Sequence, residues 1–595
     1  MRLTLKLLAY VRPYWHRAVL ALVLLSSLVV MDLAIPRLIQ RIIDQGVNAH
    51  DQQVVLSTGL LMLGISALST VIAVGNNQLS IQVGESVARD LREAIFLKIQ
   101  TLSFGNLDRR QTGGLMVRLT SDVNAFKQLT QVSLRIGTRA PLLMIGSLIL
   151  MIRTSPHLAM TMLPLLLITS AIIIFFIVKM EPLFRGVQKK LDRLNTVLQE
   201  NIAGVRLVKS FVRADFEGRR FETANEEFTA GSVTVMRFMS VMGPSLTVFV
   251  NIGMVLVIWQ GGLQAIGGSL SVGQIVAFTN YLLTTMTPLI MMTMLSNTWA
   301  NGMASAARID DVLSSAPEVE EAPDAIGLPA NMRGQVVFKD VGFHYLDGSG
   351  EAVLKDINLV IEPGQTVAVL GATGSGKSTL VNLVPRFYDV TAGQVLIDGI
   401  DVRRLKQGDL LAHIGIVPQE ALLFSGSVRD NIRYGDPQAS DEAVTASAGA
   451  AQADDFIRAL PEGYDAPVEP RGANFSGGQK QRLTIARALL TKPDILILDD
   501  STSSVDVETE TRIQQALEAQ PQRRRTTLVV AQRISTVLNA DKIVVLDRGQ
   551  IVAQGTHQEL MRSSPVYREI YDSQLGDGNH LEADVDRARS QEAAS

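Results

Sequence analysis

The residues best suited to chemistry form a glycine-rich turn between an apolar strand and a helix. The stretch TVAVLGATGSGKSTLVNLV places Gly371, Gly376, Lys377 and Ser378 at the spacing of a phosphate-binding loop. Glycines let backbone N–H groups wrap phosphates, and the dipole of the following helix favours negative charge. The lysine reaches the β- and γ-phosphates, and the serine hydroxyl is a ligand for Mg²⁺. The pattern therefore predicts a nucleoside triphosphate site.

A pair of aspartates at the end of another apolar strand is the second chemical feature. In ILILDDSTSSVD, residues 495–506, four apolar residues lead directly into Asp499 and Asp500. An acid at the carboxyl end of a buried strand commonly holds the Mg²⁺ of a nucleotide, so we expect Asp499 to do so. The second acid has the position of a catalytic base. A base that must reach a water beyond the γ-phosphate would be better served by glutamate, so an aspartate here is unexpected.

The chain that positions these residues has 595 residues, too many for one hydrophobic core, so several domains are expected. The net charge of −3 gives no reason to expect nucleic acid as a partner. Because cysteine is absent, disulfides and cysteine metal sites are excluded. The first half carries long apolar runs, whereas the rest has the pattern of a soluble α/β protein.

The apolar runs of the first half predict membrane-spanning helices, because the bilayer core requires about 20 mostly apolar residues per helix. The first run follows a basic segment and continues without a small-residue cleavage site. We therefore interpret it as a spanning helix and not as a removed signal peptide. The six predicted spans are residues 18–40, 54–75, 137–153, 157–178, 241–262 and 272–296.

Lysine and arginine are distributed unevenly among the connections between these spans. The connections 76–136 and 179–240 carry eight and eleven of them, and four precede the first span, whereas the other three connections hold only Arg41. This asymmetry predicts a multi-pass protein of the cell (inner) membrane, with a cytoplasmic N-terminus and a cytoplasmic second half. The two basic connections have helical patterns. They are either extensions of the spans or amphipathic surface helices.

Two features inside the predicted spans have open interpretations. Asp32 is an acid within the first span, and ionisable residues in a membrane mark functional or packing sites. It lies near Pro36, where freed backbone groups could be its partners, and both a structural and a transport role are open. The sixth span carries a methionine cluster, which suits a wall that fits many apolar ligands but equally suits ordinary packing. The cluster comprises Met286, Met291, Met292 and Met294.

Further motifs in the second half narrow the class of protein. They are FSGGQKQR at 475–482, VPQE at 417–420 and VVAQRIST at 529–536. Together with the phosphate loop, the aspartate strand and six preceding spans, they resemble the ATP-binding cassette (ABC) exporters, over nearly the whole chain. The resemblance implies an α-helical membrane domain of six transmembrane helices with long cytoplasmic extensions, plus an α/β P-loop ATP-binding cassette domain. The expected bounds are 1–313 for the membrane domain, 314–334 for a proline-rich linker, 335–575 for the cassette and 576–595 for a disordered tail.

The resemblance also implies roles for single residues. Tyr345 would stack on the adenine of ATP, or it is a strand aromatic of the core. Gln419 would contact Mg²⁺ and the attacking water, Asp499 would hold Mg²⁺ through water, and Asp506 would touch the partner domain. In this family, ATP lies between the phosphate loop of one subunit and the signature motif of the other. The phosphate loop would comprise Gly371, Ala372, Thr373, Gly374, Ser375, Gly376, Lys377, Ser378 and Thr379, and the signature Ser476, Gly477, Gly478 and Gln479.

Two positions depart from the family pattern, which has Glu at the position of Asp500 and His at that of Gln532. Aspartate is shorter by one methylene, about 1.5 Å. A misplacement of ~1 Å costs on the order of 10²-fold in rate. Glutamine hydrogen-bonds a γ-phosphate but cannot carry the positive charge available to histidine. The two changes together predict a site that binds ATP and hydrolyses it poorly.

The intact signature motif suggests how such a site would be used. In a heterodimer, one impaired site would contain Asp500 and Gln532, and a competent site would use the signature of this chain. The pattern resembles the degenerate-site subunit of bacterial heterodimeric multidrug exporters, which implies a second half-transporter as partner. The expected substrates are amphipathic drugs or lipid-like molecules moved out of the cytoplasm or inner leaflet. The alternatives are a homodimeric lipid flippase with slow hydrolysis, a siderophore importer on the exporter fold, and a non-pumping ATP-gated regulatory subunit.

Overall fold

The chain divides into two compact units, each described separately below. One comprises Met1–Gln100 and Gly113–Ser315, and the other comprises Thr101–Thr112 and Ala316–Ser595. The computed structural model describes residues 9–110, 112–329, 332–345, 350–502, 504–518, 525–534 and 537–575. The predicted tail at 576–595 therefore lies outside the described residues.

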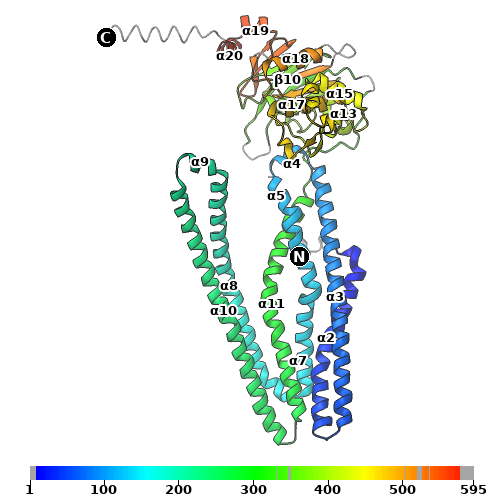
Figure 1. The fold of residues 1–595 in the computed structure, drawn as a ribbon, viewed down its shortest axis with the longest axis vertical. Helices are drawn as coiled ribbons and strands as arrows, with labels where there is room; N and C mark the ends of the chain where they lie inside the picture. The colour runs from blue at the N-terminus through cyan, green and yellow to red at the C-terminus, as the bar shows by residue number, and fades with distance from the viewer. Residues whose placement is uncertain are drawn as a thin grey trace, which may run out of the picture. The chain divides into compact units, whose positions relative to one another are not determined.

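The first unit consists of long helices (Figure 1). Three of them have 50, 48 and 53 residues, which at ~1.5 Å per residue is far more than a bilayer core of about 30 Å requires. The predicted extensions of the spans are thus confirmed, because α3, α8 and α10 continue far into the basic connections. The long helices are α2 (Trp15–Arg41), α3 (Gln52–Thr101), α7 (Thr138–Thr154), α8 (Pro156–Ala203), α10 (Ala214–Ile266) and α11 (Val272–Leu313).

Within the part of the chain that the structure describes, five helical segments are long and apolar enough to cross a membrane. The predicted sixth span lies in α11, where the side chains of Met292 and Met294 are outside the described residues. The third predicted span is the end of a longer segment, Thr112–Thr154, that includes α7. Short π-helical turns interrupt this segment, for example η4 (Ser133–Gly137).

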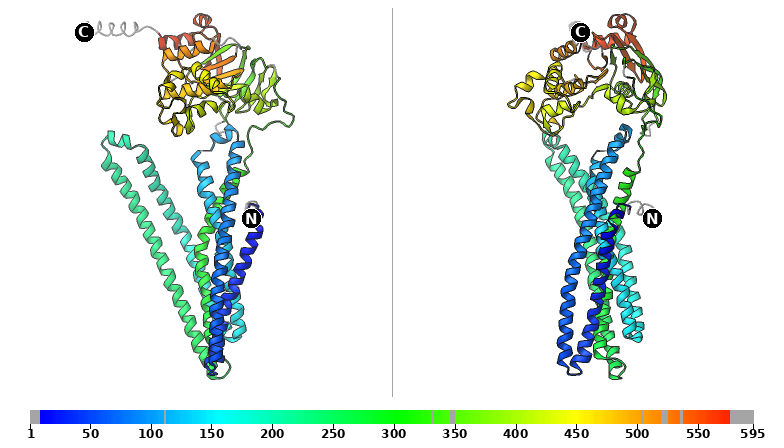
Figure 2. Two further views of the ribbon diagram at one scale, coloured as in Figure 1. Left: turned by 45° about the vertical axis from the view of Figure 1, so that its right-hand side comes forward. Right: turned by 90° about the vertical axis from the view of Figure 1, so that its right-hand side faces the viewer.

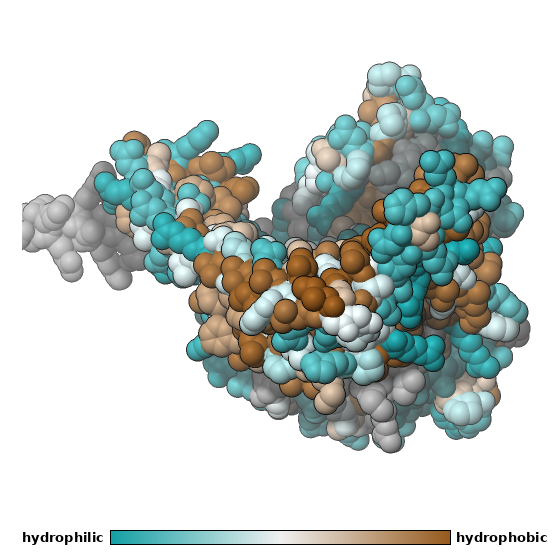
Figure 3. All heavy atoms as spheres, turned by 90° about the horizontal axis from the view of Figure 1, so that it is seen from below, coloured by the Kyte–Doolittle hydropathy of each residue, from teal (hydrophilic) through white to brown (hydrophobic). Residues whose placement is uncertain are grey.

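Helices α8 and α10 lie side by side and are joined at one end by α9 (Val205–Ser210), as Figures 1 and 2 show. Helix α11 packs against α7 and α2. Large side chains such as Phe278 and Tyr281 are fully buried at these contacts. Many other apolar side chains of the first unit are exposed (brown in Figure 3), as expected for helices that face lipid.

The acid in the first span has a different partner from the one expected. Asp32 Oδ2 accepts a hydrogen bond of 2.7 Å from Nη2 of Arg139, on α7. The expectation that backbone groups near Pro36 would satisfy this carboxylate is wrong. The guanidinium of Arg139, in the third predicted span, is the stronger partner, because a charged donor compensates a carboxylate in an apolar environment better than a neutral one does. Met286 is buried in the helix packing, and Met291 is exposed.

The second unit contains a mixed α/β core. Its larger sheet has the strand order β12-β11-β3-β10-β9-β6, in which only β12 runs antiparallel to its neighbour. The strands are β3 (Thr366–Leu370), β6 (Ile414–Val417), β9 (Ile495–Asp499), β10 (Thr526–Val530), β11 (Lys542–Asp547) and β12 (Gln550–Gly555). A second, antiparallel sheet has the order β2-β1-β4-β5, with β1 (Val336–Phe343), β2 (Leu354–Ile361), β4 (Ala392–Ile397) and β5 (Ile400–Asp401).

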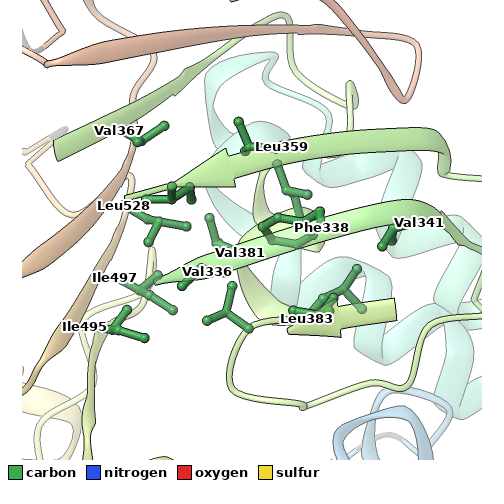
Figure 4. Close-up of a cluster of buried hydrophobic side chains, with 14 of the residues drawn as sticks. Val336, Phe338, Val341, Leu359, Val367, Val381, Leu383, Ile495, Ile497 and Leu528 are labelled. Carbon is green, nitrogen blue, oxygen red and sulfur yellow. The ribbon is translucent and has the colours of Figure 1, made fainter. Parts of the chain in front are cut away.

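The two sheets share one hydrophobic core (Figure 4). Phe338 of the antiparallel sheet is 1% exposed, and Ile497 of the parallel sheet is equally buried. Between them lies Val381 of helix α12 (Lys377–Asn382), which follows the phosphate loop. The core therefore fixes the helix whose first turn must face the phosphates.

The predicted linker at 314–334 is docked along the second unit where it is described. Arg386 Nη2 donates to the carbonyl oxygen of Glu320 at 3.0 Å, and Ile326 pairs with the backbone beside Leu405. Its first residues also contact helix α4 (Phe104–Asp108), since the N–H of Glu318 donates to Ser103 Oγ at 3.0 Å. Helix α4 belongs to the second unit although the sequence places it between two predicted spans.

Candidate nucleotide-binding site

The candidate site lies at one edge of the parallel sheet. Strands β3, β6, β9 and β10 are parallel, so their carboxyl ends meet at the same edge. The residues that follow these strands are Gly371, Gln419, Asp500 and Gln532. Three of them, Gln419, Asp500 and Gln532, line a cavity of about 310 Å³ together with Gly374, Gly376, Lys377, Ser378 and other residues.

The phosphate loop has the conformation that its glycines permit. Gly374 and Gly376 have φ angles of 83° and 101°, in the region that disfavours side chains. A Cβ on Gly376 would also approach Leu354 to 2.8 Å. Ser375 Oγ is buried and has no hydrogen-bond partner among the described residues, which leaves it available to a phosphate. The loop thus fits the phosphate chain of a nucleotide.

Lys377 is the cation of this loop and is 7% exposed. Its ammonium donates to the carbonyl oxygens of Gly371 and Ala372 at 2.8 and 2.9 Å. Burial lowers the pKa of Lys377, and the nearby charges of Asp500 and Asp499 oppose that shift. A bound phosphate would give the Lys377 ammonium a negatively charged partner in addition to these neutral carbonyl oxygens, and it would therefore favour the protonated form of the lysine.

The residues expected to hold Mg²⁺ lie together. Ser378 Oγ donates to Asp499 Oδ1 at 2.9 Å. Asp499 is 8% exposed, and burial raises the pKa of its carboxyl. A hydroxyl and a carboxylate oxygen are the hard donors that Mg²⁺ prefers beside phosphates, so this pair fits the ion. Ser378 and Asp499 would hold the ion, which would draw charge from the phosphates when bound.

Asp500 is the acceptor of two glutamine amides. Its Oδ2 accepts hydrogen bonds from Nε2 of Gln532 at 2.8 Å and from Nε2 of Gln419 at 3.2 Å. The residue has φ 47°, a left-handed conformation that aspartate tolerates better than most residues. Burial raises the pKa of Asp500, and the hydrogen bond from Gln419 acts in the opposite direction. Sequence-distant residues therefore meet at one carboxylate oxygen.

Tyr345 follows the first strand of the antiparallel sheet and lines the same cavity. Its hydroxyl and Thr379 Oγ1 form a hydrogen bond of 2.9 Å. Its ring contacts Phe343 and Tyr388 edge to face, with centroids 4.8 and 5.3 Å apart. The residue packs at the border of the core and also lines the cavity, and its stacking on adenine stays a prediction.

The signature residues lie apart from this cavity. Helix α17 (Gly477–Leu490) begins at them: Ser476 is the N-cap, and its hydroxyl and the side chain of Gln479 form a capping box. None of the four signature residues lines the phosphate-loop cavity of the same chain. Asp506 is exposed, and its Oδ1 accepts the N–H of Thr509 at 2.9 Å.

The cavity also has two lining residues that the sequence did not indicate, Val353 and Val530. Both are apolar residues next to strand ends, and no feature of their type or spacing separates them from ordinary core residues. The partner of Asp32 was equally missed. A search for basic residues in the other spans would have indicated two candidates in the third span, Arg139 and Arg153, because charges inside membranes usually pair.

The long apolar helices and the P-loop sheet define a membrane protein with a fused nucleotide-binding domain, and comparison with known proteins agrees. Residues 19–289 match the family of the ABC transporter transmembrane region, and residues 354–503 match the ABC transporter family. This chain is 37% identical over 575 residues to the uncharacterized ABC transporter ATP-binding protein YfiB of Bacillus subtilis, covering 96% of this chain and 98% of that protein.

Two further relatives extend the comparison. An ATP-dependent lipid A-core flippase of Syntrophus aciditrophicus is 37% identical over 493 residues, which cover 83% of this chain and 81% of that protein. A solved structure of a bacterial Atm1-family ABC exporter with ATP bound superposes with a TM-score of 0.81 at 27% identity, covering 94% of this chain and 99% of that one. The chain belongs to the ABC transporter family. It has the exporter fold, with a transmembrane region fused to an ATP-binding domain that drives transport.

Proposed function

We propose that this chain is the degenerate-site subunit of a heterodimeric ABC exporter for amphipathic or lipid-like molecules. One observation carries the proposal: the residue at the position of the base is a short aspartate whose Oδ2 is bound by two neutral amides. A general base must accept a proton from water. An oxygen that already accepts two hydrogen bonds has less capacity to do so, and neither amide supplies the charge of a histidine.

The rest of the site supports retention of ATP binding. The phosphate loop has its glycine geometry, Lys377 is present among the carbonyls of the loop, and Ser378 and Asp499 lie at hydrogen-bond distance. The unusual residues are Asp500, at the position of the base, and Gln532 beside it, whereas the phosphate-binding residues are present. This combination favours a site that still binds ATP but hydrolyses it poorly. The intact N-cap of α17 supports use of this signature motif by a second subunit.

The expected site in the complete transporter has further members. Gln419 would contact Mg²⁺ and the attacking water when a nucleotide is bound, and Tyr345 would stack on adenine. The second subunit would supply a Glu and a His at the positions of Asp500 and Gln532. The protein would lie in the cell (inner) membrane with its ATP-binding domain in the cytoplasm.

The test is the ATPase activity of the full chain purified alone. We expect ATP binding with slow hydrolysis that changes less than about threefold in Asp500→Ala, because a residue that is not the working base contributes little to the rate. The homodimeric flippase with slow hydrolysis predicts instead that Asp500→Ala abolishes the activity. Robust hydrolysis that disappears in this variant would overturn the heterodimer proposal. Lys377→Ala serves as the control that weakens nucleotide binding.

A further inference from the structure

A cavity inside the first unit has an uneven charge that the nucleotide chemistry does not explain. It has a volume of about 560 Å³ and is lined by residues of α2, α3, α11 and the segment that ends in α7. Among the described residues that line it, the ionisable ones are Asp32, Arg135 and Arg139. Two guanidinium groups and one carboxylate give the cavity a net charge of +1.

The two arginines differ in their partners. Arg139 is paired with Asp32 at 2.7 Å. Arg135 is half-buried, and the described residues offer it no carboxylate within ion-pair distance and no hydrogen-bond acceptor. The two arginines are four residues apart on one continuous helical segment and line the same cavity, so both guanidinium groups are available to one ligand.

The ion pair and Arg135 lie at different depths along the helices. Asp32 lies fifteen residues before Val47, the end of η2 (Ile42–Val47), and Arg139 lies fifteen residues before Thr154, the end of α7. At ~1.5 Å per residue, both are about 22 Å from the helix ends predicted to face outward. Arg135 lies four residues further from the outward end, about 28 Å from it at ~1.5 Å per residue, which is near the inner boundary of a bilayer core of about 30 Å. A guanidinium at this boundary with no carboxylate partner among the described residues suits the anionic head of a lipid-like molecule.

The remaining walls of the cavity are suited to an alkyl chain. Leu25, Leu28, Leu143 and Met291 line it, and Met291 is 48% exposed. Thioether and leucine side chains adapt to flexible apolar ligands. The cavity thus combines a cationic pole with an apolar wall.

We propose that this cavity binds an amphiphile with an anionic head, a phosphate or a carboxylate, which Arg135 and Arg139 hold while its alkyl chain lies along the apolar wall. The planar fork of a guanidinium matches the oxygens of either head group. This inference rests on the proposed export of amphipathic or lipid-like molecules, and it names the charge of the substrate. The ion pair with Asp32 keeps Arg139 in place and leaves one net positive charge for the ligand.

The test is binding to the full chain in an uncharged detergent, measured by native mass spectrometry as the fraction of protein carrying a ligand. The probes are oleoyl lysophosphatidic acid, oleate and zwitterionic oleoyl lysophosphatidylcholine, which share one acyl chain. We expect both anions to bind at least about tenfold more tightly than the zwitterion, because the choline cation of the zwitterion offsets the charge of its phosphate, whereas the anionic heads bring a net negative charge to the arginines. Equal binding of all three would overturn the proposal.

Substitutions in the cavity give opposite expected shifts. Arg135→Gln removes the surplus charge and should weaken binding of lysophosphatidic acid at least about tenfold, whereas Arg135→Lys should retain part of it. Asp32→Asn raises the net charge to +2 and should strengthen binding of the anions. Arg153→Gln removes an exposed arginine of the same helix outside the cavity and should change nothing. A loss in Arg153→Gln equal to that in Arg135→Gln would show a general charge effect and overturn the site.

Two additional binding measurements distinguish an anionic amphiphile from a free anion and from a lipophilic cation. Millimolar inorganic phosphate should not displace lysophosphatidic acid; displacement would mean that a free anion suffices and would overturn the amphiphile. The lipophilic cation tetraphenylphosphonium tests the opposite charge. If it bound more tightly than oleate, and if Asp32→Asn abolished that binding, the cavity would be a cation site and the proposal would be overturned. The assay needs neither ATP hydrolysis nor a second subunit. Its failure therefore leaves the degenerate-site proposal standing, and robust hydrolysis by this chain alone leaves the binding result unchanged.

Discussion

Restoring the two unusual positions together should convert the nucleotide site into a hydrolysing one. The perturbation is the double substitution Asp500→Glu and Gln532→His in the full chain. Two copies of this chain contain every other motif of a site, since each has an intact phosphate loop and an intact signature motif. The base and the residue beside it are then the only elements that change.

The expected magnitude follows from the geometry at Asp500. One additional methylene moves the carboxylate by up to about 1.5 Å, out of the position in which Nε2 of Gln532 and Nε2 of Gln419 bind Oδ2 at 2.8 and 3.2 Å. A displacement of ~1 Å at a reacting group corresponds to about 10²-fold in rate. At ~1.36 kcal/mol per tenfold, this is about 2.7 kcal/mol of the activation barrier. The histidine adds a donor that can carry positive charge toward the γ-phosphate.

The assay is single-turnover hydrolysis of radiolabelled ATP with protein in excess, so that the chemical step is measured and not product release. We expect the double variant to be about 10²-fold faster than the unchanged chain. Asp547→Glu lengthens another acid at the end of a strand in the same sheet that does not line the cavity, and it should leave the rate unchanged. The reasoning is refuted if the double variant binds ATP as before and hydrolyses it no faster.

Three further predictions concern binding and stability. Lys377→Ala should weaken ATP binding at least about tenfold in a fluorescent-nucleotide titration, because the phosphates lose a charged donor; unchanged affinity would contradict the placement of the phosphates. Burial raises the pKa of Asp500, so the cost of its buried charge is fully present above that raised pKa and disappears as the pH falls toward 3.8. Asp500→Asn should therefore raise the unfolding temperature by about 2 °C at pH 7 and by less toward pH 4, whereas a gain independent of pH would exclude this cause. Phe338→Ala, in a position 1% exposed, should cost about 3–5 kcal/mol of stability in urea unfolding of the cassette, against almost nothing for Val552→Ala at a position 48% exposed.

The sequence alone was sufficient for the elements whose signal is local. The phosphate loop and the aspartate strand are set by residues within a few positions of one another, and the structure has each of them where the motif predicts it. Long apolar runs likewise predict helices without any knowledge of their neighbours. The family follows from these motifs, because few combinations of membrane helices and nucleotide motifs exist in one chain.

Other features depend on contacts between distant residues, which local patterns do not specify. Gln419, Asp500 and Gln532 meet only because three parallel strands end at the same edge of the sheet. Asp32 finds Arg139, 107 positions away, because α2 packs against α7. A sequence shows that a buried charge needs a partner. Which of several arginines is that partner depends on which helices are neighbours, and this is decided by the packing of the whole unit.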